Sequence, residues 1–212
     1  INRLSSSIWW RRNLRKKHRR GLEKAALSLN LVSKRKSVYI SNESFNCFKQ
    51  QKKRNSELLK SITAINDLGQ EFTLGELSEK STSNPRVRRA ELLVRISGME
   101  QYAKEKAHIG VFFTITCPSR MHSASSKSGN RNPNYDNTTP KEAQKYLDGV
   151  WARIRSKLNR SKLSIYGVRV TEPHHDGTPH WHLLLFMQVH DMEKVTRIMR
   201  SYALQESPLE KG

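Results

Sequence analysis

Two histidines spaced two residues apart carry the clearest chemical signal in the sequence. His180 and His182 flank Trp181 at the start of a predicted strand, residues 180–188. Because side chains alternate across a strand, both imidazoles point to one face and Trp181 points to the other. Glu172, eight positions earlier, ends the preceding predicted strand, and a hairpin would bring its carboxylate beside the imidazoles. Two imidazoles and a carboxylate leave coordination positions open, so a divalent cation held there can take a phosphate oxygen.

Other interpretations of these histidines stay open. A His-apolar-His tripeptide often marks two surface histidines on a strand. His174 and His175, in the predicted turn, are either rival ligands or exposed loop histidines. A structural zinc site is a weaker alternative, because such sites usually have a closed set of four ligands and no cysteine is close to the pair. Cys47 and Cys117 are too few for a disulfide framework and are expected to be buried or indifferent thiols.

The elements that must position these residues follow the order β-α-β-β-α. The predicted strands are 110–117, 163–172 and 180–188; the predicted helices run from Pro140 to about 159 and from about 191 to 204. This order is most of a ferredoxin-like or RNA-recognition-like split βαβ arrangement in the α+β class, and we expect it to be incomplete at the C-terminus.

The preceding residues are predicted to be mainly helical. We expect helices at residues 4–31, 42–62 and 73–80, a short strand at 38–40, and a helix from Pro85 to about 107, capped by Asn84. Apolar side chains of this last helix are expected to face inward, namely Leu92, Leu93, Ile96, Met99 and Tyr102. The chain is thus predicted to divide into a helical, basic region at 1–107 and a core at 108–212 that carries Glu172 and the histidine pair.

Charge indicates the partner. The net charge is +20, and residues 1–60 hold 17 Lys and Arg against 3 Asp and Glu. This basic segment precedes a segment in which basic and acidic residues nearly balance, and the contrast favours an arm that binds the phosphates of a nucleic acid. The alternatives are a basic face that only contacts solvent and a basic face that binds an acidic membrane surface. No apolar run approaches the roughly 20 residues that span a bilayer, and no signal-peptide core is present. We therefore expect a cytoplasmic protein.

Several side chains are candidates for DNA contact. The basic run of residues 11–20 is expected to follow phosphates. Thr114 and Thr116 share a hydroxyl-lined strand face that suits phosphate, although ordinary β-propensity explains them equally well. Arg120 and His122 follow the strand and are expected either to contact DNA or to lie in a solvated loop. The basic candidates are Arg11, Arg12, Arg15, Lys16, Lys17, Arg19 and Arg20.

Three stretches resemble the replication gene A protein family of temperate tailed phages, an HUH endonuclease family. The first is Phe113-Thr-Ile-Thr-Cys-Pro-Ser-Arg-Met-His122, and the second runs from Thr171 through Glu-Pro-His-His-Asp-Gly-Thr-Pro-His-Trp-His to Phe186. The third is Gln70-Glu-Phe-Thr-Leu-Gly-Glu-Leu77 with the later Ser83-Asn-Pro-Arg and Arg89-Ala-Glu-Leu segments.

The resemblance implies an HUH nuclease core that nicks and rejoins one DNA strand at an origin to start rolling-circle replication. It implies Mg²⁺ or Mn²⁺ held by Glu172, His180 and His182, and a tyrosine that forms a 5′-phosphotyrosine and frees a 3′-OH. The implied partners are single-stranded or origin DNA and the host replicative helicase or polymerase, in the cytoplasm of a bacterial host.

One feature departs from the family pattern. The family's nucleophiles are two tyrosines four residues apart on a helix, and no two tyrosines here have that spacing. After the histidine pair only Tyr202 remains, and a packing role suits it better than a catalytic one. We therefore expect the chain to stop before its catalytic tyrosines. The rival hypothesis is a non-catalytic DNA-binding module with the same fold.

Overall fold

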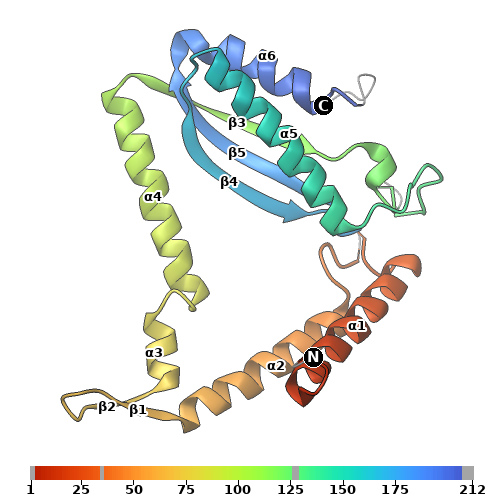
Figure 1. Cartoon of the computed structure of the whole chain (residues 1–212), viewed down its shortest axis with the longest axis vertical. Coiled ribbons are helices and arrows are strands. Elements are labelled where there is room, and N and C mark those ends of the chain that lie inside the picture. The colour runs from red at the N-terminus through yellow and green to blue at the C-terminus, as the bar shows by residue number, and fades with distance from the viewer. Residues whose placement is uncertain (1–2, 34–35, 126–128, 207–212) are drawn as a thin grey trace. The chain divides into compact units, whose positions relative to one another are not determined.

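The computed structural model describes residues 3–33, 36–125 and 129–206 (Figure 1). Helices and strands both contribute, as the predicted α+β class requires. The residues group into two compact units, described in turn. The first contains residues 1–47, 116–148 and 172–180, and the second contains residues 48–115, 149–171 and 181–212. Each unit takes residues from both sides of position 107, and the division into 1–107 and 108–212 stays a prediction.

The first unit opens with the basic helix α1 (Ser7–Ser28). The helix begins where the Ser6 hydroxyl accepts a hydrogen bond from the backbone N–H of Trp9, at 3.2 Å. Near its end, the Glu23 carboxylate accepts hydrogen bonds from the backbone and the hydroxyl of Ser41, at 2.8 and 2.7 Å. Ser41 immediately precedes α2 (Asn42–Ser61), so one carboxylate ties the two helices together.

The short strand predicted at residues 38–40 is wrong. The segment is a bend whose side chains are exposed, and the Ser37 hydroxyl donates a hydrogen bond to the carbonyl of Ile40 at 2.6 Å. A β-rich tripeptide forms a strand only when another strand offers a hydrogen-bonding edge. Here the local hydrogen bond closes a turn instead.

In the second unit, a small hairpin that the sequence did not predict connects α2 to two further helices. Its strands, β1 (Thr63–Ile65) and β2 (Glu71–Thr73), are antiparallel and only three residues long. Next, α3 (Leu74–Lys80) carries a capping box between Thr73 and Glu76. The helix α4 (Pro85–Glu105) begins at Asn84, as predicted, since the Asn84 side chain accepts a hydrogen bond from the Arg86 N–H. Within the described residues, no helix has the length and apolarity that crossing a membrane demands.

The apolar side chains of α4 are more exposed than predicted. Leu92, Leu93 and Tyr102 are 40%, 54% and 48% exposed, whereas Ala103 is buried. Because apolar residues are spread around this helix rather than along one stripe, no single contact can bury them all.

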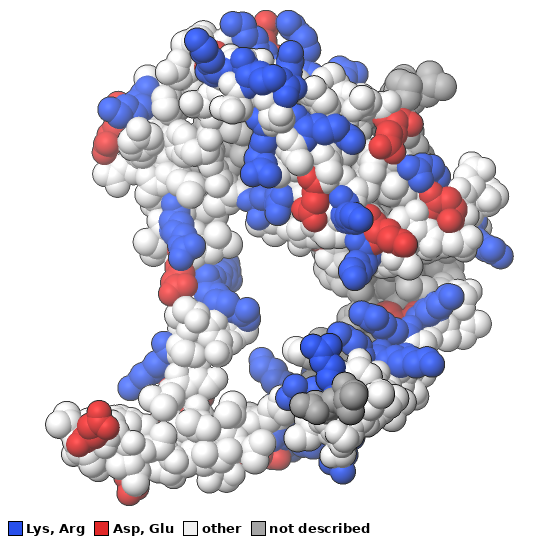
Figure 2. Space-filling view, in the orientation of Figure 1, with Lys and Arg blue, Asp and Glu red and all other residues white. Residues whose placement is uncertain are grey.

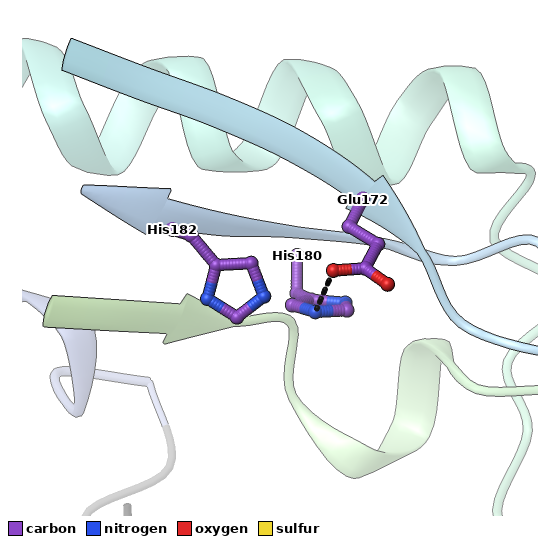
Figure 3. A group of neighbouring side chains, drawn as sticks. All are labelled: Glu172, His180 and His182. Atoms are coloured by element: carbon purple, nitrogen blue, oxygen red, sulfur yellow. Dashed lines mark ion pairs between the residues drawn. The ribbon is translucent and has the colours of Figure 1, made fainter. Parts of the chain in front are cut away.

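A three-stranded sheet, in the order β3-β5-β4, has most of its residues in the second unit. The strands are β3 (His108–Thr116), β4 (Tyr166–Pro173) and β5 (Pro179–Gln188). With α5 (Pro140–Arg160) between β3 and β4, and α6 (Met192–Ala203) after β5, the element order is the predicted β-α-β-β-α. The arrows in Figure 3 show that the central strand β5 runs opposite to both neighbours.

The main apolar core lies on one face of this sheet. Figure 1 shows α5 crossing that face, and Leu158 of α5 lines a recess together with Leu183 and Leu185 of β5. Trp181 is fully buried, with the Arg169 guanidinium 3.7 Å from its ring centroid. The buried apolar side chains of the two helices and of this face of β5 are Ala143, Leu147, Val150, Ile154 and Leu158 on α5, Trp181, Leu183, Leu185 and Met187 on β5, and Val195 and Met199 on α6.

A glycine in β4 permits the close pairing of β4 with β5. Gly167 has φ of +154°, and a Cβ there would lie 1.9 Å from the carbonyl oxygen of Leu184. Only a residue without a side chain fits this position.

We therefore expect Gly167→Ala to lower the free energy of unfolding by more than about 2 kcal/mol, because the two strands must separate. Urea denaturation monitored by circular dichroism measures the change. The matched control is Gly149→Ala in α5, where a Cβ meets nothing within 4 Å, so this helix is expected to gain about 0.5–1 kcal/mol. Equal stability of the two variants would contradict the assigned role of Gly167.

Candidate metal centre

The histidine pair lies on the face of β5 that is turned away from the core. Trp181 and Leu183 are 0% exposed, whereas His180 and His182 are half-buried on the other face. Figure 3 shows the two imidazoles standing side by side on this face. The alternation predicted from the sequence is thus confirmed, and its cause is the burial of Trp181.

A hairpin brings Glu172 to the same place. The chain turns back between β4 and β5 through hydrogen bonds from His174 N to Thr178 O and from Gly177 N to His174 O, each 2.8 Å, with Gly177 at φ of +83°. The Glu172 carboxylate then lies 3.8 Å from His180 Nε2.

One ligand atom from each of Glu172, His180 and His182 lies within 4.8 Å of the other two (Figure 3). Donors roughly 2.1 Å from one ion lie about 3–4 Å apart, so small side-chain movements are enough to close the group around a divalent cation. The donor set, two imidazoles and a carboxylate, suits a first-row divalent ion. Within the described part of the chain, this is the one group of three or more such side chains with this convergence.

The His182 imidazole is held by β3. Its Nδ1 lies 3.1 Å from the Thr114 hydroxyl, and its ring stacks on Phe112 with centroids 5.4 Å apart and planes at 21°. Because Nδ1 faces the hydroxyl, Nε2 is the nitrogen that offers a lone pair to a metal ion. Thr114 was predicted as a DNA contact, and its side chain is exposed. Its hydrogen bond to His182 indicates that it orients this imidazole.

Glu172 is held by a residue that sequence reasoning missed. The Tyr39 hydroxyl, from the bend between α1 and α2, donates a hydrogen bond to a carboxylate oxygen of Glu172. This hydrogen bond, and the negative charge of Glu172, raise the pKa of Tyr39. The two residues are 133 positions apart, and no local pattern in the sequence connects them.

The turn histidines are not the exposed loop residues that one alternative described. His175 is 8% exposed, and the His174 ring lies 4.2 Å from the ring of His180 and 4.9 Å from that of His122. Burial, reinforced by the neighbouring His180 and His122, lowers the pKa of His174 to about 4. His174 is therefore neutral at neutral pH and packs against His180 without adding a positive charge.

A buried carboxylate anchors this turn. Asp176 accepts hydrogen bonds from Ser123 N at 2.9 Å and Thr178 N at 3.0 Å, and it pairs with His122 Nδ1 at 3.2 Å. Burial alone would raise the pKa of Asp176, but the hydrogen bonds from His122 and Thr178 outweigh it and lower the pKa to about 2. His122, predicted as a DNA contact, thus has a side chain that is 19% exposed and engaged in holding the turn.

The remaining predicted DNA contacts lie on the surface. Thr116 is exposed at the end of β3, and Arg120 pairs with Asp136 while its side chain stays 46% exposed. The basic residues Arg11, Arg12, Arg15, Lys16, Lys17, Arg19 and Arg20 are all exposed along α1. Contact of these residues with DNA stays a prediction.

Figure 2 shows Lys and Arg gathered over α1 and, within the second unit, around α6 and the C-terminal end of α5. The sequence analysis did not single out this second group. The exposed basic residues of these two helix segments are Arg155, Lys157 and Arg160 on α5, and Lys194, Arg197 and Arg200 on α6.

Two other candidate side chains can now be placed. Tyr202 lies in the last turn of α6 and is half-buried, and its role as a nucleophile stays a prediction. Cys117 is buried, and this burial raises the pKa of its thiol to about 12. A thiol with this pKa is inert at neutral pH, in line with the predicted buried cysteine.

Comparison with known proteins gives one consistent result. The family profile described as bacteriophage replication gene A protein matches residues 1–212. The chain is 40% identical over 210 residues to the replication gene A protein of Escherichia phage 186, covering 99% of this chain and 30% of that protein. It is 43% identical over 213 residues to the probable replication protein P12 of Pseudoalteromonas phage PM2, covering 100% of this chain and 32% of that protein.

A third relative is the probable replication endonuclease from prophage-like region 1 of Salmonella typhi, 38% identical over 212 residues, with 100% of this chain and 26% of that protein covered. The chain therefore spans about a third or less of the length of these relatives. No solved structure matches it.

The contact between Thr114 and His182 predicts a graded effect on metal binding. Thr114→Val is expected to weaken Mn²⁺ binding by about 10-fold, because the imidazole loses the partner that fixes its orientation. Titration of the variants with Mn²⁺, followed by electron paramagnetic resonance, measures the affinity. Thr116→Val, an exposed threonine on the same strand face, is the matched control; equal affinities of the two variants would refute the role of Thr114.

The Asp176 network predicts an effect on stability. Asp176→Ala is expected to lower the free energy of unfolding by about 3 kcal/mol, because Ser123 N, Thr178 N and His122 lose their acceptor. The folded-state pKa lies below the ordinary value of 3.8, so the stabilisation is present at neutral pH and is lost as the pH falls from about 4 toward 2. Thermal unfolding between pH 2 and pH 7 tests both statements. Asp148→Ala, at an exposed position on α5, serves as the control and is expected to change the stability little. A change of the same small size for Asp176→Ala would contradict the role of Asp176 in holding the turn.

Proposed function

The chain belongs to the bacteriophage replication gene A protein family, and we propose that it carries the metal centre of an endonuclease that nicks and rejoins one DNA strand at a phage or prophage replication origin. One observation carries the proposal: the ligand atoms of Glu172, His180 and His182 converge within 4.8 Å on an open face of the sheet. A pure DNA-binding module has no need of such a group.

The fold supports the same proposal. The order β-α-β-β-α, with two histidines on the central strand and a carboxylate on the neighbouring strand, is what an HUH core of ferredoxin-like or RNA-recognition-like type requires. We place this core at residues 108–212 and a basic, helical DNA-binding region at residues 1–107.

The bound ion is proposed to be Mg²⁺ or Mn²⁺. A divalent ion at this site would withdraw charge from a non-bridging oxygen of the scissile phosphate. The chain's own residues have separate tasks: Thr114 fixes the orientation of His182, Tyr39 fixes that of Glu172, and the hairpin held by Asp176 keeps both strands in register.

The nucleophile is proposed to be a tyrosine in the part of the longer relatives that these 212 residues do not cover. Its phenolic oxygen would form a bond to phosphorus while the bond from phosphorus to the 3′-oxygen breaks. The 3′-oxygen leaves with a proton as a 3′-OH, and the ester energy stays in the phosphotyrosine for rejoining. Tyr202 is the alternative within the chain. The exposed basic residues of α1 would hold the DNA backbone.

The first test separates a metal-dependent nuclease core from a DNA-binding module. His182→Ala is expected to weaken Mn²⁺ binding at least 10-fold, while affinity for single-stranded DNA at fixed salt changes by less than about 2-fold, because most of the phosphate contacts are assigned to the basic residues of α1. His190→Ala is the matched control, since its side chain is 74% exposed beyond the end of β5. Equal Mn²⁺ affinity in His182→Ala and the parent would favour the module.

The same variant tests the covalent step. A longer chain that includes residues beyond Gly212, incubated with labelled origin single strands and Mn²⁺, is expected to give an adduct that survives denaturing electrophoresis. The His182→Ala version of that chain is expected to give none. An adduct formed by residues 1–212 alone would move the nucleophile to Tyr202.

A further inference from the structure

The face of the sheet that carries the metal ligands also carries exposed apolar surface. On this face the even-numbered residues of β3 follow one another, and Gly110, Phe112, Thr114 and Thr116 are all exposed. Phe112 is 64% exposed, while the next residue on the opposite face, Phe113, is half-buried. A large aromatic ring therefore stands on the open face between a glycine and two hydroxyl groups.

The position of this ring relative to the metal centre is fixed by a direct contact. Phe112 stacks on His182, with ring centroids 5.4 Å apart and planes at 21°. An aromatic ring bound to the outer side of Phe112 would extend this stack. A nucleotide whose base lies there would have its phosphate next to the metal ligands.

One step further along the strands, the same face is hollowed. Gly110 and Leu184 are the next residues on this face after Phe112 and His182, and with Phe186 and Ala103 of α4 they line a recess of about 350 Å³. A Cβ at Gly110 would lie 3.0 Å from the Phe186 ring, so a larger residue there would press on that ring. Behind it, Tyr166 stacks on Phe186 at 5.4 Å. The exposed ring of Phe112 is thus bordered by this recess.

We infer that Phe112 is a base-stacking subsite for the nucleotide at or next to the scissile phosphate in a single DNA strand. The inference rests on the proposed function and adds the substrate contact that the metal ligands do not supply. A base in a single strand exposes its π-face, and stacking on an aromatic side chain is largely independent of base identity. The strong positive charge of the chain favours a nucleic acid over an apolar protein segment as the occupant.

The test measures how tightly the 212-residue chain binds a fluorescein-labelled 25-residue thymidine oligonucleotide in the presence of Mn²⁺. Phe112→Leu is expected to weaken binding by about 10-fold, whereas Phe112→Tyr, which keeps the ring, is expected to bind within about 2-fold of the parent. Phe48→Leu is the matched control, because Phe48 of α2 is also exposed, at 56%. Affinity for a duplex is expected to be unchanged in all three variants, since paired bases do not offer their faces.

Two further readouts separate stacking from other roles of the ring. The slope of log affinity against log salt concentration is expected to be the same for Phe112→Leu and the parent, because no phosphate contact is lost. A 2-aminopurine placed once in the oligonucleotide is expected to be quenched by the parent and by Phe112→Tyr, and much less by Phe112→Leu.

The outcomes distinguish this inference from the proposed function. If Phe112→Leu binds the single strand as the parent does while His182→Ala loses Mn²⁺, the subsite is wrong and the metal centre stands. If Phe112→Leu loses Mn²⁺ affinity together with DNA affinity, the ring only supports His182, and the subsite is again wrong. If the parent does not prefer a single strand to a duplex, the subsite is refuted, and His182→Ala alone then decides the metal centre.

Discussion

The two-residue alternation of β5 is the constraint on which the rest of the structure depends. Trp181, Leu183, Leu185 and Met187 are buried on one face, and His180 and His182 must therefore share the other. Each large apolar side chain contributes about 2 kcal/mol by leaving water, so a slip of one residue would expose the whole set. The burial that stabilises the sheet is also what directs the two imidazoles to one side.

The three side chains of the candidate metal centre are held by contacts from three separate parts of the chain. Thr114 of β3 contacts His182, Tyr39 contacts Glu172, and the turn that joins the two ligand-bearing strands is fixed by Asp176. A ligand set this small leaves positions open for substrate, so its geometry has to come from such supporting contacts. The packing of neutral His174 against His180 adds bulk without adding charge that would oppose a cation.

The two faces of the sheet have different physical character. One face is covered by α5 and closed by apolar packing. The other presents imidazoles, hydroxyl groups and the exposed ring of Phe112. Positive charge is concentrated on helices, on α1 in one unit and on α5 and α6 in the other, where long side chains can follow phosphates.

The sequence by itself determined the local features. The period of two around Trp181, the cap at Asn84 and the turn that contains His174 and His175 depend on neighbouring residues, and the order β-α-β-β-α followed from them. Only the tertiary structure decided which distant residues meet. The bend at residues 38–40, the exposure of Leu93 and the contacts of Tyr39 with Glu172 and of Thr114 with His182 depend on strand register and chain path, which local pattern does not encode.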